Sequence, residues 1–131
     1  MKTHTEITNS INKPSDDFKN MQLSLNTRHS FETFIHTYSS SYPKIIFFIT
    51  ASWCNPCKLA KPIVYDYAAK YRDILLIELD FDASRETVHY LKVKSVPSLV
   101  SFYLGNKDNV CFGCSDNQIK SIFQTLQSLP L

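Results

Sequence analysis

The segment that most constrains the fold of this chain is an apolar run that leads directly into a pair of cysteines. Residues 44–50 read KIIFFIT, rich in branched and aromatic side chains and far too short to span a membrane. Such a run is typical of a strand buried on both faces, as in the middle of a parallel sheet. The next segment, ASWCNPCKLAKP (51–62), places Cys54 and Cys57 where a helical pattern begins. The fold therefore has to present this cysteine pair at the end of a central strand.

The remaining elements alternate along the chain in a way that indicates an α/β fold. Strands are predicted at 21–26, 44–50, 74–82 and 97–104, with a hairpin return at 106–112, and helices at 29–40, 55–71, 84–93 and 115–129. The early alternation implies parallel crossovers, and the hairpin adds antiparallel strands to the same sheet. We expect one domain over 21–131, a central mixed sheet with helices on both faces, preceded by a flexible polar extension over 1–20.

The predicted helices differ in how clearly the sequence marks where they start and which face is apolar. The 55–71 helix contains Pro62, which should kink it, and its apolar residues recur every fourth position at Leu59, Ile63, Tyr67 and Tyr71. The 29–40 helix has only a weak start signal, Ser30 followed by Thr33. Ser84 is expected to cap the 84–93 helix, and Ser115 or Asp116 the last one.

Composition excludes several classes of function. The chain has only two glycines, which argues against a phosphate loop or a dinucleotide fingerprint. Its net charge of +2, with both signs interspersed, predicts neither nucleic acid nor a membrane surface as a partner. No secretory signal is recognisable near residue 1, so we expect a reducing compartment, cytoplasmic or nuclear, where the four cysteines are catalytic, metal-binding or plain thiols.

The first C-x-x-C has a direct chemical interpretation. Cys54 would lie at the positive end of a helix, where unpaired N–H groups and the helix dipole favour a thiolate. Cys57, one turn further on, would be better shielded and could resolve a mixed disulfide formed on Cys54. Pro56 would fix the first helical turn, Lys58 would add a nearby positive charge, and Trp53 would offer a flat apolar surface to a partner polypeptide.

The segment WCNPCK (53–58) resembles the W-C-G-P-C-K motif of the thioredoxin family. Further likeness, over roughly residues 21–129, comes from the acidic strand end IELDFD (77–82), from SVPSL (95–99) with the family's cis-proline, and from Pro62, Gly105 and Gly113. Several motifs in the same order are far more specific than C-x-x-C alone.

This resemblance implies a protein disulfide reductase, with Cys54 as nucleophile and Cys57 as resolving thiol. It also implies that a surface shared by several residues grips the partner, namely Trp53, Asn55, Pro56, Val96, Pro97 and Gly113. The expected partners are disulfide-containing proteins and a separate thioredoxin reductase, with no bound cofactor or metal. An oxidase or isomerase on the same fold, and a non-enzymatic binding module, are the alternatives.

Two positions depart from the family pattern. Phe48 stands six residues before Cys54, where the family usually has a buried aspartate that helps the second cysteine lose its proton, so slower resolution of mixed disulfides or a weaker pH dependence is expected. Glu78 or Asp80 could replace that carboxylate, although ordinary solvated carboxylates are the favoured interpretation. Asn55 replaces a glycine in the dipeptide that tunes the redox potential.

The four cysteines also allow other interpretations. Two buried inert thiols are possible at 54 and 57, but packing does not require the surrounding tryptophan, proline and lysine. A zinc site would need both C-x-x-C pairs to converge, which the long separation disfavours. The second pair, Cys111 and Cys114, is either a relay that serves the first or two incidental thiols, and the incidental reading is favoured. The family resemblance implies that Cys114 could lie near Cys54 while Cys111 points elsewhere along the strand.

Overall fold

A computed structural model describes residues 22–23 and 25–131, so the predicted extension over 1–20 lies outside the described residues. The strands are β1 (Gln22–Leu23), β2 (Lys44–Thr50), β3 (Leu75–Asp80), β4 (Ser98–Tyr103) and β5 (Asn106–Phe112). The helices are α3 (Arg28–Tyr38), α4 (Asn55–Lys70), α5 (Arg85–Tyr90) and α6 (Asp116–Ser128). None of these helices has the length and apolar character needed to cross a membrane.

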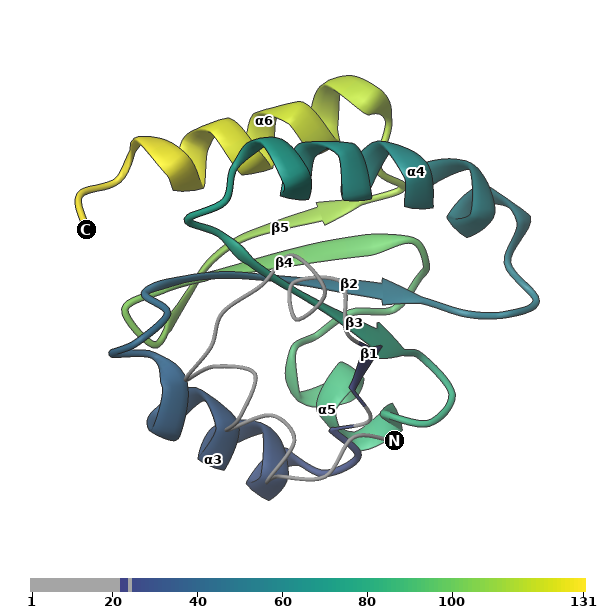
Figure 1. Cartoon of the computed structure of the whole chain (residues 1–131). Coiled ribbons are helices and arrows are strands. Elements are labelled where there is room, and N and C mark those ends of the chain that lie inside the picture. Colours follow the sequence, from purple (N-terminus) through teal and green to yellow (C-terminus); the bar gives the residue numbers. More distant parts are fainter. Residues whose placement is uncertain (1–21, 24) are drawn as a thin grey trace.

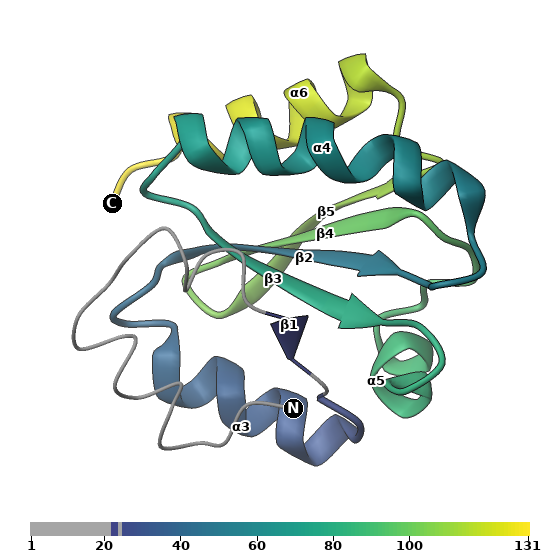
Figure 2. The same cartoon turned by 45° about the vertical axis from the view of Figure 1, so that its right-hand side comes forward.

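The five strands form one mixed sheet in the order β1-β3-β2-β4-β5. β3 runs parallel to β1 and β2, whereas β4 is antiparallel to both β2 and β5. Helices α4 and α6 cover one face of the sheet and α3 and α5 cover the other (Figures 1 and 2). The predicted fold class is therefore confirmed, and the strand that carries the cysteine pair at its end lies in the centre of the sheet.

The central strand divides its side chains between two cores. Ile45, Phe47 and Ile49 pack against α3 and α5, and Ile46 and Phe48 pack in the cluster under α4 and α6. Successive side chains of a strand point to opposite faces, and a strand covered on both faces must be apolar throughout. The unbroken apolar run of the sequence thus follows from its central position.

Two helix starts differ from their predictions. Helix α3 begins after Thr27, whose side-chain oxygen accepts a hydrogen bond from the Ser30 backbone N–H. The Ser30 hydroxyl accepts one from the Thr27 backbone N–H in return, which completes a capping box. The start signal predicted at Ser30 was therefore wrong. Ser84 precedes α5 but makes no side-chain capping bond, and its buried hydroxyl has no partner among the described residues. In α6, Ser115 is the cap and forms a reciprocal box with Gln118.

The buried face of α4 is not the every-fourth stripe seen in the sequence. Small residues form it, namely Cys57, Ala60, Val64 and Ala68, and they let the helix approach the sheet closely. Tyr67 and Tyr71 instead stack on Phe123 of α6, at ring separations of 5.9 and 6.1 Å, and Leu59 is 75% exposed. The helix continues through Pro62.

Candidate active site

The cysteine pair lies where the central strand passes into α4. Cys54 is the N-cap residue of α4, with an extended backbone, and its Sγ accepts a hydrogen bond from the Cys57 N–H at 3.2 Å. A sulfur in this position receives an otherwise unpaired helix N–H and faces the positive end of the helix dipole. The local sequence therefore produces the electrostatic setting that a thiolate needs.

Cys54 and Cys57 are joined by a disulfide, with their Cα atoms 5.3 Å apart. Both are buried and cluster with Ala51, and the half-buried Phe81 and Val96 pack against them. The predicted Val96–Pro97 cis peptide bond is present. Chain segments far apart in sequence thus meet around one redox-active pair.

The other predicted contact residues divide into an exposed and a buried group. Trp53 is 62% exposed; its indole N–H donates to Asp82 at 2.7 Å, and its ring meets Phe81 edge-on. Asn55 and Pro56 are exposed on the first turn of α4.

Pro97, by contrast, is buried, and the structure places Gly113 beside it. The Pro97 carbonyl oxygen accepts a hydrogen bond from the Gly113 N–H at 3.1 Å. Gly113 has φ +71°, a conformation that side-chain-bearing residues rarely adopt. This hydrogen bond joins the turn after β5 to Pro97, whose neighbour Val96 packs against the cysteine pair.

A buried carboxylate shares a cleft with Cys57. Glu78 is only 3% exposed, so its interpretation as a solvated carboxylate was wrong. Its Oε1 accepts a hydrogen bond from the Tyr65 hydroxyl at 2.6 Å and lies 3.5 Å from the Lys61 ammonium. Cys57 and Glu78 both line a cleft of about 340 Å³, together with Thr50, Ala51, Ser52, Lys58, Lys61 and Asp80.

The surroundings of Glu78 explain both its burial and its charge partners. It pairs in register with Phe48 on β2, so both side chains point towards α4. Burial and the hydrogen bond to Glu78 raise the pKa of Tyr65, which therefore remains a donor. Asp80 serves a different purpose, since its carboxylate accepts the Ala83 N–H at 2.8 Å in the turn after β3.

The second pair of cysteines is also assembled, contrary to one expectation. Cys111 does not point elsewhere: its Sγ lies 3.5 Å from that of Cys114. Both thiols are buried in the core under α4 and α6, apart from the cluster that holds Cys54 and Cys57. Because the pairs do not converge, they cannot share one zinc ion, and no cluster of three or more potential metal ligands occurs within residues 22–23 and 25–131.

Comparison with known proteins decides the family. The family model described as thioredoxin matches residues 22–127, most of the chain. The chain belongs to the thioredoxin family. Its place in that family agrees with the cis-proline and with the cysteine pair at the start of α4.

Individual thioredoxins are similar to the chain at moderate identity. Mitochondrial thioredoxin O1 of Arabidopsis thaliana is 29% identical over 72% of this chain and 52% of its own length. Mitochondrial thioredoxin O2 of the same plant is 31% identical over 62% of this chain and 52% of its own length. Human thioredoxin is 27% identical over 59% of this chain and 73% of its own length. The chain thus spans about half the length of the two plant thioredoxins that it matches.

Solved thioredoxin structures have the same fold. Oxidised thioredoxin O2 from Arabidopsis thaliana superposes with a TM-score of 0.69 at 25% identity, over 82% of this chain and 94% of that one. Mitochondrial thioredoxin 3 from Saccharomyces cerevisiae superposes with a TM-score of 0.71 at 20% identity. The superposition covers 86% of this chain and 100% of the yeast chain.

Proposed function

We propose that this chain is a protein disulfide reductase that works by dithiol–disulfide exchange. The observation that carries the proposal is the bonded Cys54–Cys57 pair at the N-terminus of α4, beside the Val96–Pro97 cis peptide. Turbidity caused by reduced insulin, with dithiothreitol as electron donor, tests it.

The reaction needs only these two sulfurs. The reduced Cys54 thiolate attacks one sulfur of a substrate disulfide, the other sulfur leaves as a thiol, and a mixed disulfide forms. Cys57 then attacks the Cys54 sulfur, releases the second substrate thiol and leaves the Cys54–Cys57 disulfide. A separate reductase of the thioredoxin reductase kind returns two electrons and two protons to this disulfide.

The exposed residues beside Cys54 are proposed to bind the partner polypeptide, and Trp53 offers the largest apolar surface among them. Replacing Trp53 with alanine should raise the KM for insulin about two- to tenfold, because an aromatic contact contributes about 0.5–1.5 kcal/mol beyond its area. The rate with a small aromatic disulfide should change much less. Steady-state kinetics with both substrates measures this, with the exposed Leu59→Ala as control. An equal effect on both substrates would contradict a polypeptide-binding role.

Glu78 is proposed to accept the proton that Cys57 loses. Phe48 offers no acceptor where the family usually has an aspartate, and a thiol buried in apolar surroundings gives up its proton reluctantly. Glu78 is the buried carboxylate of the cleft that Cys57 lines, and water in that cleft would connect the two groups. Lys61 and Tyr65 hold the carboxylate in place.

Replacing Glu78 with glutamine should slow the resolution of mixed disulfides by about a hundredfold near neutral pH, the low end of what a positioned acid–base group contributes. The defect should shrink as pH rises, because hydroxide then removes the proton. Rapid-quench measurement of the mixed disulfide across pH tests this, with Tyr65→Phe as a control that keeps the carboxylate.

Introducing Phe48→Asp into the Glu78→Gln chain should restore part of the rate, because it returns a carboxylate to the position where the family has one. Phe48→Asp alone should also speed resolution. Identical rates and pH profiles in all these chains, with circular dichroism confirming that they fold, would remove Glu78 from the mechanism.

The compartment remains a prediction. The sequence favours a cytoplasmic or nuclear location, whereas the plant relatives are mitochondrial by name. A fluorescent fusion of the full chain distinguishes these locations.

A further inference from the structure

The two thiols of the CFGC segment meet across a tight turn at the end of β5. Their sulfurs are 3.5 Å apart, against about 2.05 Å in a disulfide. Gly113 has φ +71° and Cys114 has φ +30°, a region that residues with side chains rarely occupy. Backbone held in such a conformation concentrates at functional sites, and here it turns Cys114 back towards Cys111.

The two thiols are chemically unequal. The Cys114 thiol donates to two carbonyl oxygens, that of Pro97 at 3.4 Å and that of Cys111 at 3.5 Å, and its sulfur accepts a hydrogen bond from the Cys111 thiol. The hydrogen bond between the two thiols lowers the pKa of Cys111, and that same interaction, with burial, raises the pKa of Cys114. Because two carbonyl oxygens hold the Cys114 proton, Cys111 is the thiol that ionises more readily.

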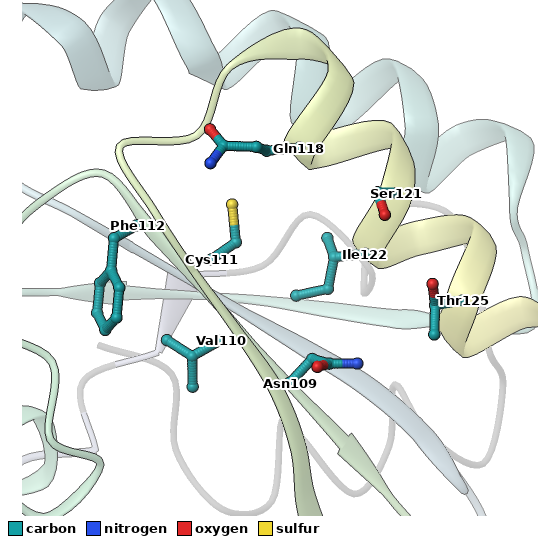
Figure 3. Close-up of a pocket in the computed structure, with 8 residues that line it drawn as sticks. All are labelled: Asn109, Val110, Cys111, Phe112, Gln118, Ser121, Ile122 and Thr125. Carbon is teal, nitrogen blue, oxygen red and sulfur yellow. The ribbon is translucent and has the colours of Figure 1, made fainter.

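Cys111 is only 9% exposed, yet it borders a cleft. It lines a cleft of about 540 Å³ between β5 and α6, and Figure 3 shows its sulfur directed from the strand towards the helix. Polar side chains from both elements share the cleft, namely Asn109, Gln118, Ser121 and Thr125. Such a lining suits the amide and carboxylate groups of a small peptide.

We propose that Cys111 and Cys114 form a second thiol–disulfide exchange centre, which takes small peptide disulfides of the oxidised glutathione kind. The Cys111 thiolate attacks one sulfur of the small disulfide and expels one small thiol, which leaves a mixed disulfide on Cys111. Cys114 then loses its proton and attacks the Cys111 sulfur, which expels the second small thiol. The protein pair is oxidised by two electrons, and the small disulfide is reduced to two thiols.

This centre goes beyond the proposed reductase activity and does not depend on it. Cys54 and Cys57 belong to another cluster, and trypsin separates the pairs. Cleavage after Lys107 and Lys120 isolates residues 108–120, which contain Cys111 and Cys114 but neither active-site cysteine.

The test uses the full-length Cys54→Ser, Cys57→Ser chain, reduced and then mixed with oxidised glutathione near neutral pH. Mass spectrometry of the tryptic peptide should show loss of both thiols as an internal disulfide, with two glutathione thiols released. Adding Cys114→Ser should stop the reaction at a stable glutathione adduct on Cys111. Adding Cys111→Ser instead should abolish both products.

A cleft-filling variant tests the route of access. Ser121→Phe lies on the exposed side of α6 and should slow the reaction with oxidised glutathione several-fold, while a methyl thiosulfonate still modifies Cys111 at its original rate. If a multiple variant fails to fold, as judged by circular dichroism, the same peptide is followed in the wild-type chain. Adducts that form first on Cys114, or thiols that stay free in a folded chain, would overturn the proposal.

Discussion

Replacing Cys54 with serine should reduce insulin reduction to the rate of dithiothreitol alone. The Cys54 sulfur is the proposed attacking atom, and a serine hydroxyl at this helix terminus neither ionises near neutral pH nor forms a bond to sulfur that a thiol can displace. The loss should be complete because Cys57 lies within the first turn of α4 and is only 1% exposed, whereas Cys54 is the N-cap residue that precedes the helix. Insulin turbidity against time provides the measurement.

Replacing Cys57 with serine should give a different defect from replacing Cys54. The first attack remains possible, so a mixed disulfide with insulin should accumulate and be visible as a heavier band on a non-reducing gel. Leu59→Ala, an exposed change two residues away on α4, should keep full activity. If Cys54→Ser reduced insulin as fast as the wild type, the disulfide-exchange mechanism would be wrong and the binding-module alternative would gain support.

Replacing Phe47 with alanine should lower the free energy of unfolding by about 3–5 kcal/mol. Phe47 is fully buried on the central strand, and its ring meets those of Phe31, Phe34 and Phe102 at centroid separations of 4.9, 6.3 and 5.5 Å. Truncation removes these contacts and leaves a cavity that surrounding strands cannot fill. Since whole domains are stable by only about 5–15 kcal/mol, this one change removes a large share.

Urea unfolding followed by circular dichroism measures the effect of Phe47→Ala. Phe112→Ala is the matched control, because the same side chain is 49% exposed at the end of β5 and should change stability by about 0.5 kcal/mol or less. Similar losses in the two variants would mean that the aromatic cluster around Phe47 does not hold α3 against the sheet.

Local patterns predicted most of the secondary structure correctly. The apolar run at 44–50 became the central strand, the hairpin return at 106–112 became β5, and Ser115 became the cap of α6. The cis-proline and the partner-facing surface came from family resemblance, because nothing in the residues around Pro97 distinguishes cis from trans. The predicted start of α3 is wrong because the capping residue is Thr27, two residues before the predicted helix at 29–40.

The sequence predicted exposure wrongly for side chains whose burial depends on how another helix or strand packs. Glu78 alternates with apolar neighbours along β3, as a solvated residue would, yet α4 covers that face and supplies Lys61 and Tyr65 as partners. Leu59 has the spacing of a core residue, yet α4 turns it towards solvent.

The sequence alone determined where a reactive thiol would lie, because the end of an apolar strand, a proline and the first turn of a helix are set by neighbouring residues. Only the tertiary structure decided that Cys111 faces Cys114 and a polar cleft, and that Glu78 shares a cleft with Cys57. A side chain is buried only where a second segment of the chain packs against it, and the pattern of one segment does not show which other segment will do so.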